Sequence, residues 1–455
     1  MLGSEVSYAE KSLKGRTSYS EGRFTGVVKE LFPPSHVLLP QINQIYELDL
    51  AWGEYNKLDG PAVISRGAYF RSVEGLDTHH YKICMRTPDQ VNASARQSRK
   101  NFFAANVFAV GYATHGLFPY RGKFHPQMVK AILNIMGLAP GKKVLDPMAG
   151  CGTVGIEASI MGIDSVTNEL SPFACLMTRA KIGVLETDCR AFGRLRVEAR
   201  EIFDALEKTF DHRRGRRNLI DEDAQAPLRF SAADSDGKIL ASLPQSLLEL
   251  LTLCFLDSVG YAERRANKTP RDLFPDVLGR YLDAVEAFNG SRRELGLKVG
   301  KASTLRGDAR HLKLEDVSVD GVLFSPPYSF AIDYLENDRP QLELMGVEVD
   351  DLRAEMVGLR GEGRNEEQRV AARLREYFDD MRLILSECSR VLRSGCYCTV
   401  VVGSNTNQTG GITLEDRLIE LGESAGLKLQ FQIMREIEGI RNTMREEYLL
   451  FFKKE

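Results

Sequence analysis

The chain has 455 residues, of which 43% are hydrophobic and 27% charged, enough apolar residues to build a sizeable core in two or three domains. Its 60 Lys and Arg residues nearly balance 63 Asp and Glu residues, so the formal net charge is −3. That balance excludes a protein that holds nucleic acid by bulk positive charge, although a local basic face would still suffice. We recognise no secretory leader and no membrane-spanning run, and the eight scattered cysteines predict free thiols, no metal site and a cytoplasmic location.

The first hundred residues carry the weakest structural pattern. The first two dozen are polar and predict a mobile arm. Residues 24–83 mix short apolar runs with turn signals, which predicts an irregular or small β-containing segment. We therefore assign residues 1–104 to an N-terminal extension that is partly irregular.

A regular alternation of elements follows. Pro126 and Gly137 bracket a predicted helix, as proline suits the start of a helix and glycine its end. Residues 143–146 predict a buried strand, residues 154–161 a helix, and residues 164–169 a second strand. A strand, a Gly-rich turn, a helix and a strand make a βαβ unit with a parallel sheet. We expect an α/β fold with a Rossmann-like, doubly wound sheet, whose first part is residues 105–190.

The pattern changes twice more along the chain. Residues 191–298 are dominated by helical patterns broken by prolines, which predicts a mostly helical insertion with a possible role in target recognition. Strand-like alternation returns at residues 320–324, followed by a long amphipathic helix at 367–392 and strands at 396–402 and 448–452. Residues 299–455 are therefore predicted to complete the core.

The turn after the first core strand is a candidate cofactor site. Glycines between a strand and a helix let the backbone turn tightly and approach a ligand. Glu169 lies 23 residues after Asp146, close to the spacing at which an acid accepts hydrogen bonds from ribose hydroxyls. A turn that needs glycines for its geometry alone is the alternative. The turn consists of Asp146, Pro147, Met148, Ala149, Gly150, Cys151, Gly152 and Thr153.

The residues of this turn favour S-adenosylmethionine over a dinucleotide. We interpret the glycines as G-x-G without a third glycine, because Gly155 falls where the helix should already run. Asp146 would repel phosphates but suits the ammonium group of an amino-acid moiety. S-adenosylmethionine carries such an ammonium group and has no phosphate.

A second motif, Ser325-Pro326-Pro327-Tyr328, follows the strand at 320–324. Two successive prolines fix the backbone and have no N–H, so their carbonyls can point rigidly at a ligand. The Ser325 hydroxyl and a proline carbonyl could accept both protons of a planar amine whose ring stacks on Tyr328. Such an array favours attack by a nucleobase amine on a methylsulfonium. A stiff loop with a core tyrosine is the alternative.

Together these two motifs resemble the amino-methylating DNA methyltransferases, particularly the cytosine-N4 branch, in which serine usually precedes the two prolines. The segments at 114–126, 331–334 and 441–448 are also similar to that family. The resemblance covers about residues 105–190 and 300–455. It implies S-adenosylmethionine as cofactor, DNA as substrate and a possible restriction or defence partner.

The resemblance also implies roles for individual residues. The methionine part of the cofactor would contact Asp146, Pro147, Ala149, Gly150, Gly152 and Thr153, and the segment before the turn would contribute Lys123 and Phe124. Asp308, after a plausible third strand, would accept the adenine amino group, although a turn-forming Gly-Asp pair is the alternative. The catalytic residues would be Ser325, Pro326, Pro327 and Tyr328.

Other functions remain open at this point. The chain could methylate adenine N6 in DNA or a base amine in RNA, such as a guanine amine of tRNA, or be a catalytically silent nucleic-acid-binding subunit. Attack by a cysteine at cytosine carbon 5 is disfavoured, because no cysteine lies near residues 325–328. The insertion lies between Glu169 and Asp308, which fits none of the usual family orders. Phosphate contacts could come from two arginine groups, Arg213, Arg214, Arg216, Arg217, Arg264 and Arg265 in the insertion and Arg360, Arg364, Arg369 and Arg373 after the catalytic motif.

Overall fold

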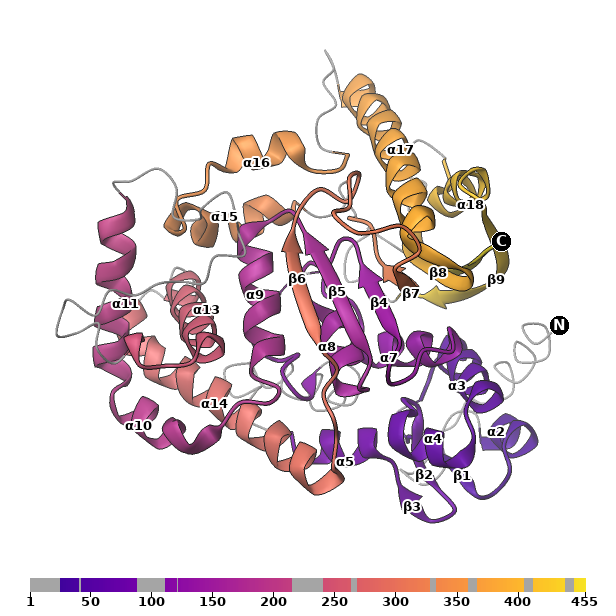
Figure 1. The fold of residues 1–455 in the computed structure, drawn as a ribbon, viewed down its shortest axis with the longest axis horizontal. Coiled ribbons are helices and arrows are strands. Elements are labelled where there is room, and N and C mark those ends of the chain that lie inside the picture. The colour runs from indigo at the N-terminus through magenta and orange to yellow at the C-terminus, as the bar shows by residue number, and fades with distance from the viewer. Residues whose placement is uncertain are drawn as a thin grey trace.

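A seven-stranded sheet lies at the centre of the computed structural model, which describes residues 25–40, 42–87, 111–120, 122–214, 240–262, 268–327, 333–358, 366–404, 412–437 and 446–455 (Figure 1). Its strand order is β6-β5-β4-β7-β8-β10-β9. The strands from β6 to β8 are parallel, and β10 runs antiparallel to both β8 and β9. The bounds are β4 (Lys143–Asp146), β5 (Asp164–Glu169), β6 (Ala302–Arg306), β7 (Val319–Phe324), β8 (Leu392–Ser404), β9 (Leu427–Glu436) and β10 (Glu446–Lys454).

Helices cover both faces of this sheet because successive strand residues point to opposite sides. Val144 packs in a cluster with α7 (Pro126–Ile135) and α8 (Thr153–Ile160), whereas Leu145 packs in a cluster with α17 (Glu366–Val391) and α18 (Leu414–Ser424). The helix α9 (Pro172–Gly183) lies beside α8. The predicted α/β fold with a doubly wound sheet is confirmed.

Between β5 and β6 the chain forms a helical layer, on the left of Figure 1. It contains α10 (Phe192–Val197), α11 (Ala199–Arg214), α13 (Gln245–Ala262) and α14 (Pro270–Leu295) after a short 3-10 turn η3 (Cys189–Ala191). The helices share a buried core with α9, rich in leucine and phenylalanine. Thr269 caps α14, because its hydroxyl accepts from the Asp272 N–H and Pro270 occupies the first turn.

The N-terminal segment is more helical than its sequence predicts. Its three-stranded sheet, β1 (His36–Leu38), β2 (Phe70–Val73) and β3 (Leu76–Asp77), agrees with the β-containing prediction, but four helices accompany it. Glu47 starts the longest, because its carboxylate accepts from the N–H groups of Asn43 and Gln44. These helices are α2 (Thr25–Leu31), α3 (Ile45–Lys57), α4 (Gly60–Arg66) and α5 (His79–Met85). The predicted mobile arm lies outside the described residues.

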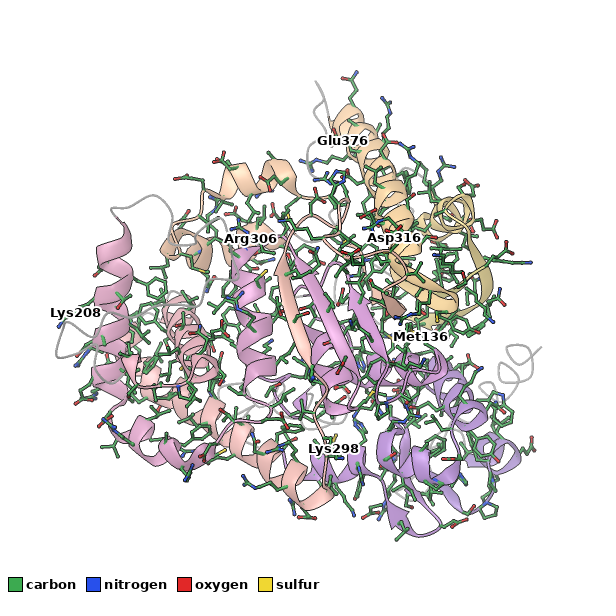
Figure 2. All side chains as sticks on the ribbon, viewed as in Figure 1. Met136, Lys208, Lys298, Arg306, Asp316 and Glu376 are labelled. Atoms are coloured by element: carbon green, nitrogen blue, oxygen red, sulfur yellow. The ribbon has the colours of Figure 1, made fainter. Side chains whose placement is uncertain are left out.

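A buried carboxylate joins this segment to the core. Glu54 of α3 is fully buried and accepts hydrogen bonds from the Ala68 and Tyr69 N–H groups and from the Asn134 amide of α7. Met136, just after α7, is buried in a hydrophobic cluster that the N-terminal segment shares with α7. Lys208, by contrast, lies on the exposed side of α11 (Figure 2). The N-terminal segment therefore packs on the helix that precedes the cofactor turn.

All eight cysteines are free thiols. Within the described part of the chain, no helix has the length and apolarity needed to cross the membrane.

Candidate functional site

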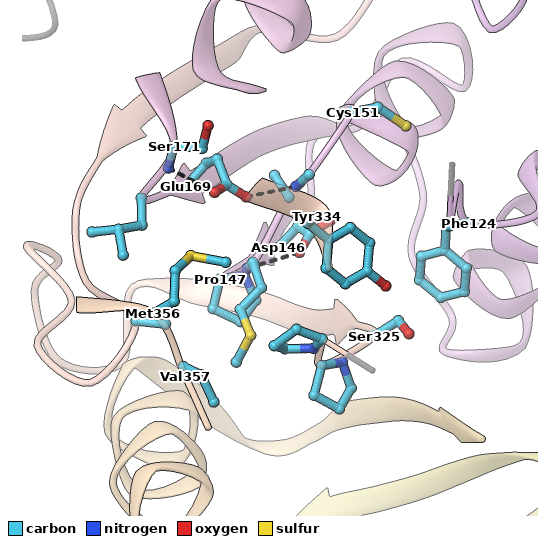
Figure 3. Close-up of a pocket in the computed structure, with 18 of the residues that line it drawn as sticks. Phe124, Asp146, Pro147, Cys151, Glu169, Ser171, Ser325, Tyr334, Met356 and Val357 are labelled. Atoms are coloured by element: carbon cyan, nitrogen blue, oxygen red, sulfur yellow. Dashed lines mark hydrogen bonds between the residues drawn. The ribbon is translucent and has the colours of Figure 1, made fainter. Parts of the chain in front are cut away.

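A cavity of about 1030 Å³, including its open mouth, lies at the carboxyl ends of the parallel strands. Asp146 ends β4, Glu169 ends β5, Asp308 follows β6 and Ser325 follows β7, and all four line this cavity. Ligands of doubly wound sheets bind at this edge. The structure thus brings together residues from both predicted motifs (Figure 3).

The Gly-rich turn needs its glycines for backbone conformation and for space. Gly150 has φ = 50° and Gly152 has φ = 81°, a region that favours glycine. A Cβ at Gly152 would lie 2.8 Å from two Thr178 side-chain atoms. Gly150, Cys151 and Thr153 line the cavity, whereas Gly152, predicted to bind the cofactor, is not among the lining residues.

Gly155 corrects our interpretation of the glycine pattern. It lies inside α8, three residues after Gly152, and so completes a G-x-G-x-x-G spacing. A Cβ there would lie 2.8 Å from side-chain atoms of both Ile182 and Thr167, so the glycine permits close packing of α8. The glycine count therefore does not separate a dinucleotide from S-adenosylmethionine. That distinction depends on the charges of the cavity.

Glu169 closes the turn from the neighbouring strand. Its carboxylate accepts from the Gly150 N–H at 2.8 Å and from the Ser171 N–H at 2.9 Å, as the dashed lines in Figure 3 show. Burial raises its pKa against the effect of these hydrogen bonds. Each carboxylate oxygen can accept more than one hydrogen bond, so Glu169, which lines the cavity, can also accept hydrogen bonds from a ligand.

Asp146 is almost fully buried at the base of the cavity. It is 3% exposed and accepts from the Met148 N–H at 3.1 Å. Burial raises its pKa well above the usual range of an aspartate, and the nearby charge of Glu169 raises it further. A cationic group in the cavity would stabilise the ionised form of this carboxyl.

Asp308, which also lines the cavity, belongs to an ion-pair network. The Arg310 guanidinium donates to both Asp308 oxygens at 2.8–2.9 Å, to Asp380 of α17 at 2.9 Å and to the Glu355 carbonyl at 2.9 Å. Burial opposes the charge on Asp308, but Arg310 keeps its pKa below the usual value. Asp308 is thus held as a carboxylate acceptor.

Three of the four predicted catalytic residues line the same cavity. Ser325, Pro326 and Pro327 follow β7 directly, while Tyr328 lies outside the described residues. Phe124 also lines the cavity, together with Pro147 and Ala149. Lys123 does not; its ammonium donates to the His115 carbonyl at 2.7 Å, behind the turn.

Two aromatic residues, Tyr120 and Tyr334, and two acids, Asp338 and Glu355, line the cavity without having been predicted as site residues. Tyr120 and Tyr334 are nearly parallel, with an interplanar angle of 19° and centroids 6.5 Å apart. Tyr334 and Asp338 come from α15 (Tyr334–Leu344), and residues 355–357, at and after the end of α16 (Val349–Glu355), add another wall. Tyr334 ends a stretch that resembles the family, but Asp338 has no motif that could have identified it.

The predicted arginine groups fall mostly outside the described side chains. Of the ten arginines, only the side chain of Arg373 belongs to the described part of the chain. Their contact with phosphate therefore stays a prediction.

The known proteins to which this chain is similar in sequence are methyltransferases. The model of an RMKL-like methyltransferase domain, UPF0020, matches residues 117–246. Type II methyltransferase M.BsoBI of Geobacillus stearothermophilus is 21% identical over 274 residues, which are 52% of this chain and 54% of that protein. Type II methyltransferase M.MjaII of Methanocaldococcus jannaschii is 40% identical over 68 residues, or 15% of this chain and 13% of that protein.

The chain spans about half the length of the first of these relatives and less of the second. Among solved structures, TrmN from Thermus thermophilus is 13% identical to this chain, with a TM-score of 0.30. The match covers 74% of this chain and 50% of the TrmN chain. A likeness at that level adds nothing to the fold, which the sheet order already defines.

Proposed function

We propose that this chain transfers a methyl group from S-adenosylmethionine to the N4 amine of cytosine in DNA, because its motifs resemble those of amino-methylating DNA methyltransferases and parts of it are similar to two type II methyltransferases. Methyl transfer and S-adenosylmethionine are supported by the similarity to methyltransferases. The base, the atom and the polymer are the proposed part. The observation that carries them is the position of Ser325, Pro326 and Pro327 in the cavity that also contains Asp146 and Glu169.

The cavity fits S-adenosylmethionine by its charge. Five acidic residues line it, and no Lys or Arg belongs to the described lining. A dinucleotide would bring two phosphates into this acidic surrounding, whereas S-adenosylmethionine brings an ammonium and a sulfonium group. We assign Asp146 and Gly150 to the methionine part, Glu169 to the ribose and Asp308 to the adenine amino group.

The catalytic motif would prepare the amine of a base that has left its stack. The lone pair of an exocyclic amine is delocalised into the ring, which makes it a weak nucleophile. The Ser325 hydroxyl and a carbonyl of the proline pair are acceptors for its two protons, and acceptors in this arrangement favour a pyramidal nitrogen. The cofactor supplies an electrophilic methyl group, and the cavity aligns the amine with it.

Two measurements test the substrate. Purified protein, labelled S-adenosylmethionine and DNA should give labelled DNA, and nucleoside mass spectrometry should identify N4-methylcytosine. N6-methyladenine would replace the base in the proposal, and label found only in RNA would overturn the DNA assignment. Methylome sequencing of cells that express the protein would then give the recognition sequence and show whether a restriction partner protects against the same site.

Ser325→Ala tests the catalytic motif. We expect turnover to fall about a hundredfold, the usual scale for losing one preorganised hydrogen-bonding group. Cofactor affinity, measured by calorimetry, should change less than about twofold, because the methionine and ribose contacts remain. Unchanged turnover would remove Ser325 from the mechanism.

A further inference from the structure

Asp338 places an acid in the cavity that the proposed mechanism does not use. It lies four residues after Tyr334 on α15, so the two side chains share one face of the helix. Both line the cavity, and Asp338 is 8% exposed. The opposite face carries Glu336, Arg339 and Glu343, which pair with one another near the surface.

The cavity brings Asp338 close to the ribose acid. The pKa of Asp338 is raised to about 7, mainly by burial and to a smaller extent by the nearby negative charge of Glu169. Both acids also act on the Tyr120 hydroxyl, whose ring lies against the Gly-rich turn. A chain of contacts around the cavity joins the two acids: Tyr334, on the helix face of Asp338, stacks with Tyr120, whose ring lies 3.8 Å from the Cβ position of Gly150. Gly150 in turn donates its N–H to Glu169.

Among the described residues, the elements packed around α15 provide no cation that forms an ion pair with Asp338 or Glu169. Arg179 of α9 is held by Glu249 of α13 at 2.7 Å, and Arg353 of α16 is held by Asp333 at 2.9 Å. The buried ammonium of Lys181, also on α9, interacts with Cys151 and Asp257 and not with this pair. The other titratable groups among the described side chains of these elements and of the lining are Cys175, Cys254, Asp350, Asp351, Glu355, Asp146, Asp308, Tyr120 and Tyr334.

Ionising two neighbouring buried carboxyls together costs much free energy unless a cation lies beside them. The methyl donor provides one. Its sulfur is positive before transfer. The nitrogen lone pair forms the new N–C bond, the C–S electron pair stays on sulfur, and the methylated nitrogen then gives one proton to water. The product sulfur is therefore neutral, while its ammonium and carboxylate groups are unchanged.

We propose that Asp338 and Glu169 form a paired-carboxylate site for the sulfonium of S-adenosylmethionine, which distinguishes the cofactor from its demethylated product. The proposal rests on the proposed function, because it assumes that cofactor. It explains the acid on α15 as a group that attracts the positively charged methyl donor more strongly than the product, whose sulfur is neutral. Asp338 is a cofactor-binding residue in this proposal.

Calorimetric titration at pH 8 tests it directly, with S-adenosylmethionine and S-adenosylhomocysteine as the two probes. We expect Asp338→Asn to weaken binding of the first about tenfold and of the second less than about twofold. Glu343→Gln, on the exposed side of the same helix, is the matched control and should change neither. Equal losses for both ligands, or no loss, would overturn the proposal, as would unchanged binding with a lower kcat, which would assign Asp338 to the base.

A second measurement needs no variant. At pH 7 part of the Asp338 population is protonated, so binding of the sulfonium should release protons, measurable as a heat that depends on the ionisation enthalpy of the buffer. S-adenosylhomocysteine should release fewer. Equal release by both ligands would contradict the paired-carboxylate site. If the native protein bound neither ligand, the proposed function itself would fail.

Discussion

Single buried charged residues stabilise the helix that follows the Gly-rich turn. Glu157 of α8 is fully buried, and its two oxygens lie 2.6 Å from His115 Nε2 and 3.3 Å from Lys130 Nζ. Burial alone would raise the pKa of Glu157, but Lys130 and His115 reverse this and lower the pKa to about 2. Burial lowers the pKa of His115 to about 4, so at neutral pH the imidazole is neutral and its N–H donates to Glu157.

Glu157→Gln should destabilise the protein by about 3–5 kcal/mol at pH 7, because it leaves Lys130 buried without a counter-charge. The folded pKa of about 2 lies below the usual value of 4.5, so the stabilisation is complete above pH 4.5 and is lost as the pH falls toward 2. Urea unfolding from pH 7 to 3 should show the native protein and the variant converging. Glu186→Gln, which breaks only an exposed pair with Arg292, should change stability by less than about 0.5 kcal/mol, and an equal loss there would contradict this account.

At the scale of elements, the sequence predicted those helices and strands that are marked by a local residue pattern. The strands β4 and β5 and the helix α8 were predicted because a short apolar run, a Gly-rich turn and helical spacing occur together within 27 residues of sequence. The strand β9 and helix α18 were not predicted. Six of the ten side chains of β9 are exposed and it lies at an edge of the sheet, so its sequence lacks the apolar alternation of a buried strand.

Gly155→Ala should destabilise the protein by about 1–2 kcal/mol. Alanine improves helix propensity by about 1 kcal/mol, but its methyl group would clash with Ile182 and Thr167, which are fixed by α9 and β5. Gly193→Ala in α10 is the matched control: nothing lies within 4 Å of its Cβ position, so only the propensity gain remains. Thermal unfolding of both variants should move Tm in opposite directions; an increase for Gly155→Ala would contradict the packing argument.

At the scale of the whole molecule, the cavity is assembled from distant segments. Its lining runs from Tyr120 to Val357, and the single guanidinium of Arg310 joins the end of β6 to α16 and α17. The sequence could place Asp146, Glu169 and Ser325 because motifs mark them. It could not place Asp338 or Arg310, because their partners come from elements whose packing is not encoded locally.

A ligand that contacts so many segments should stabilise all of them together. At a concentration of 100 times its Kd, S-adenosylmethionine should add about 2.7 kcal/mol to the free energy of unfolding. Differential scanning calorimetry should show one transition that moves upward with cofactor concentration. A shift confined to part of a split transition would show that the helical layer unfolds independently of the cavity.

The place of the helical layer between β5 and β6 has a consequence during synthesis. These strands are neighbours in the sheet, yet 132 residues separate their last and first residues, Glu169 and Ala302. At about 5–20 residues per second, Ser325 leaves the ribosome about 8–30 s after Glu169. During that interval the nascent chain exposes the edge of β5 and half of the cofactor cavity. The edge of β5 therefore stays unpaired until the helical layer and β6 have been synthesised.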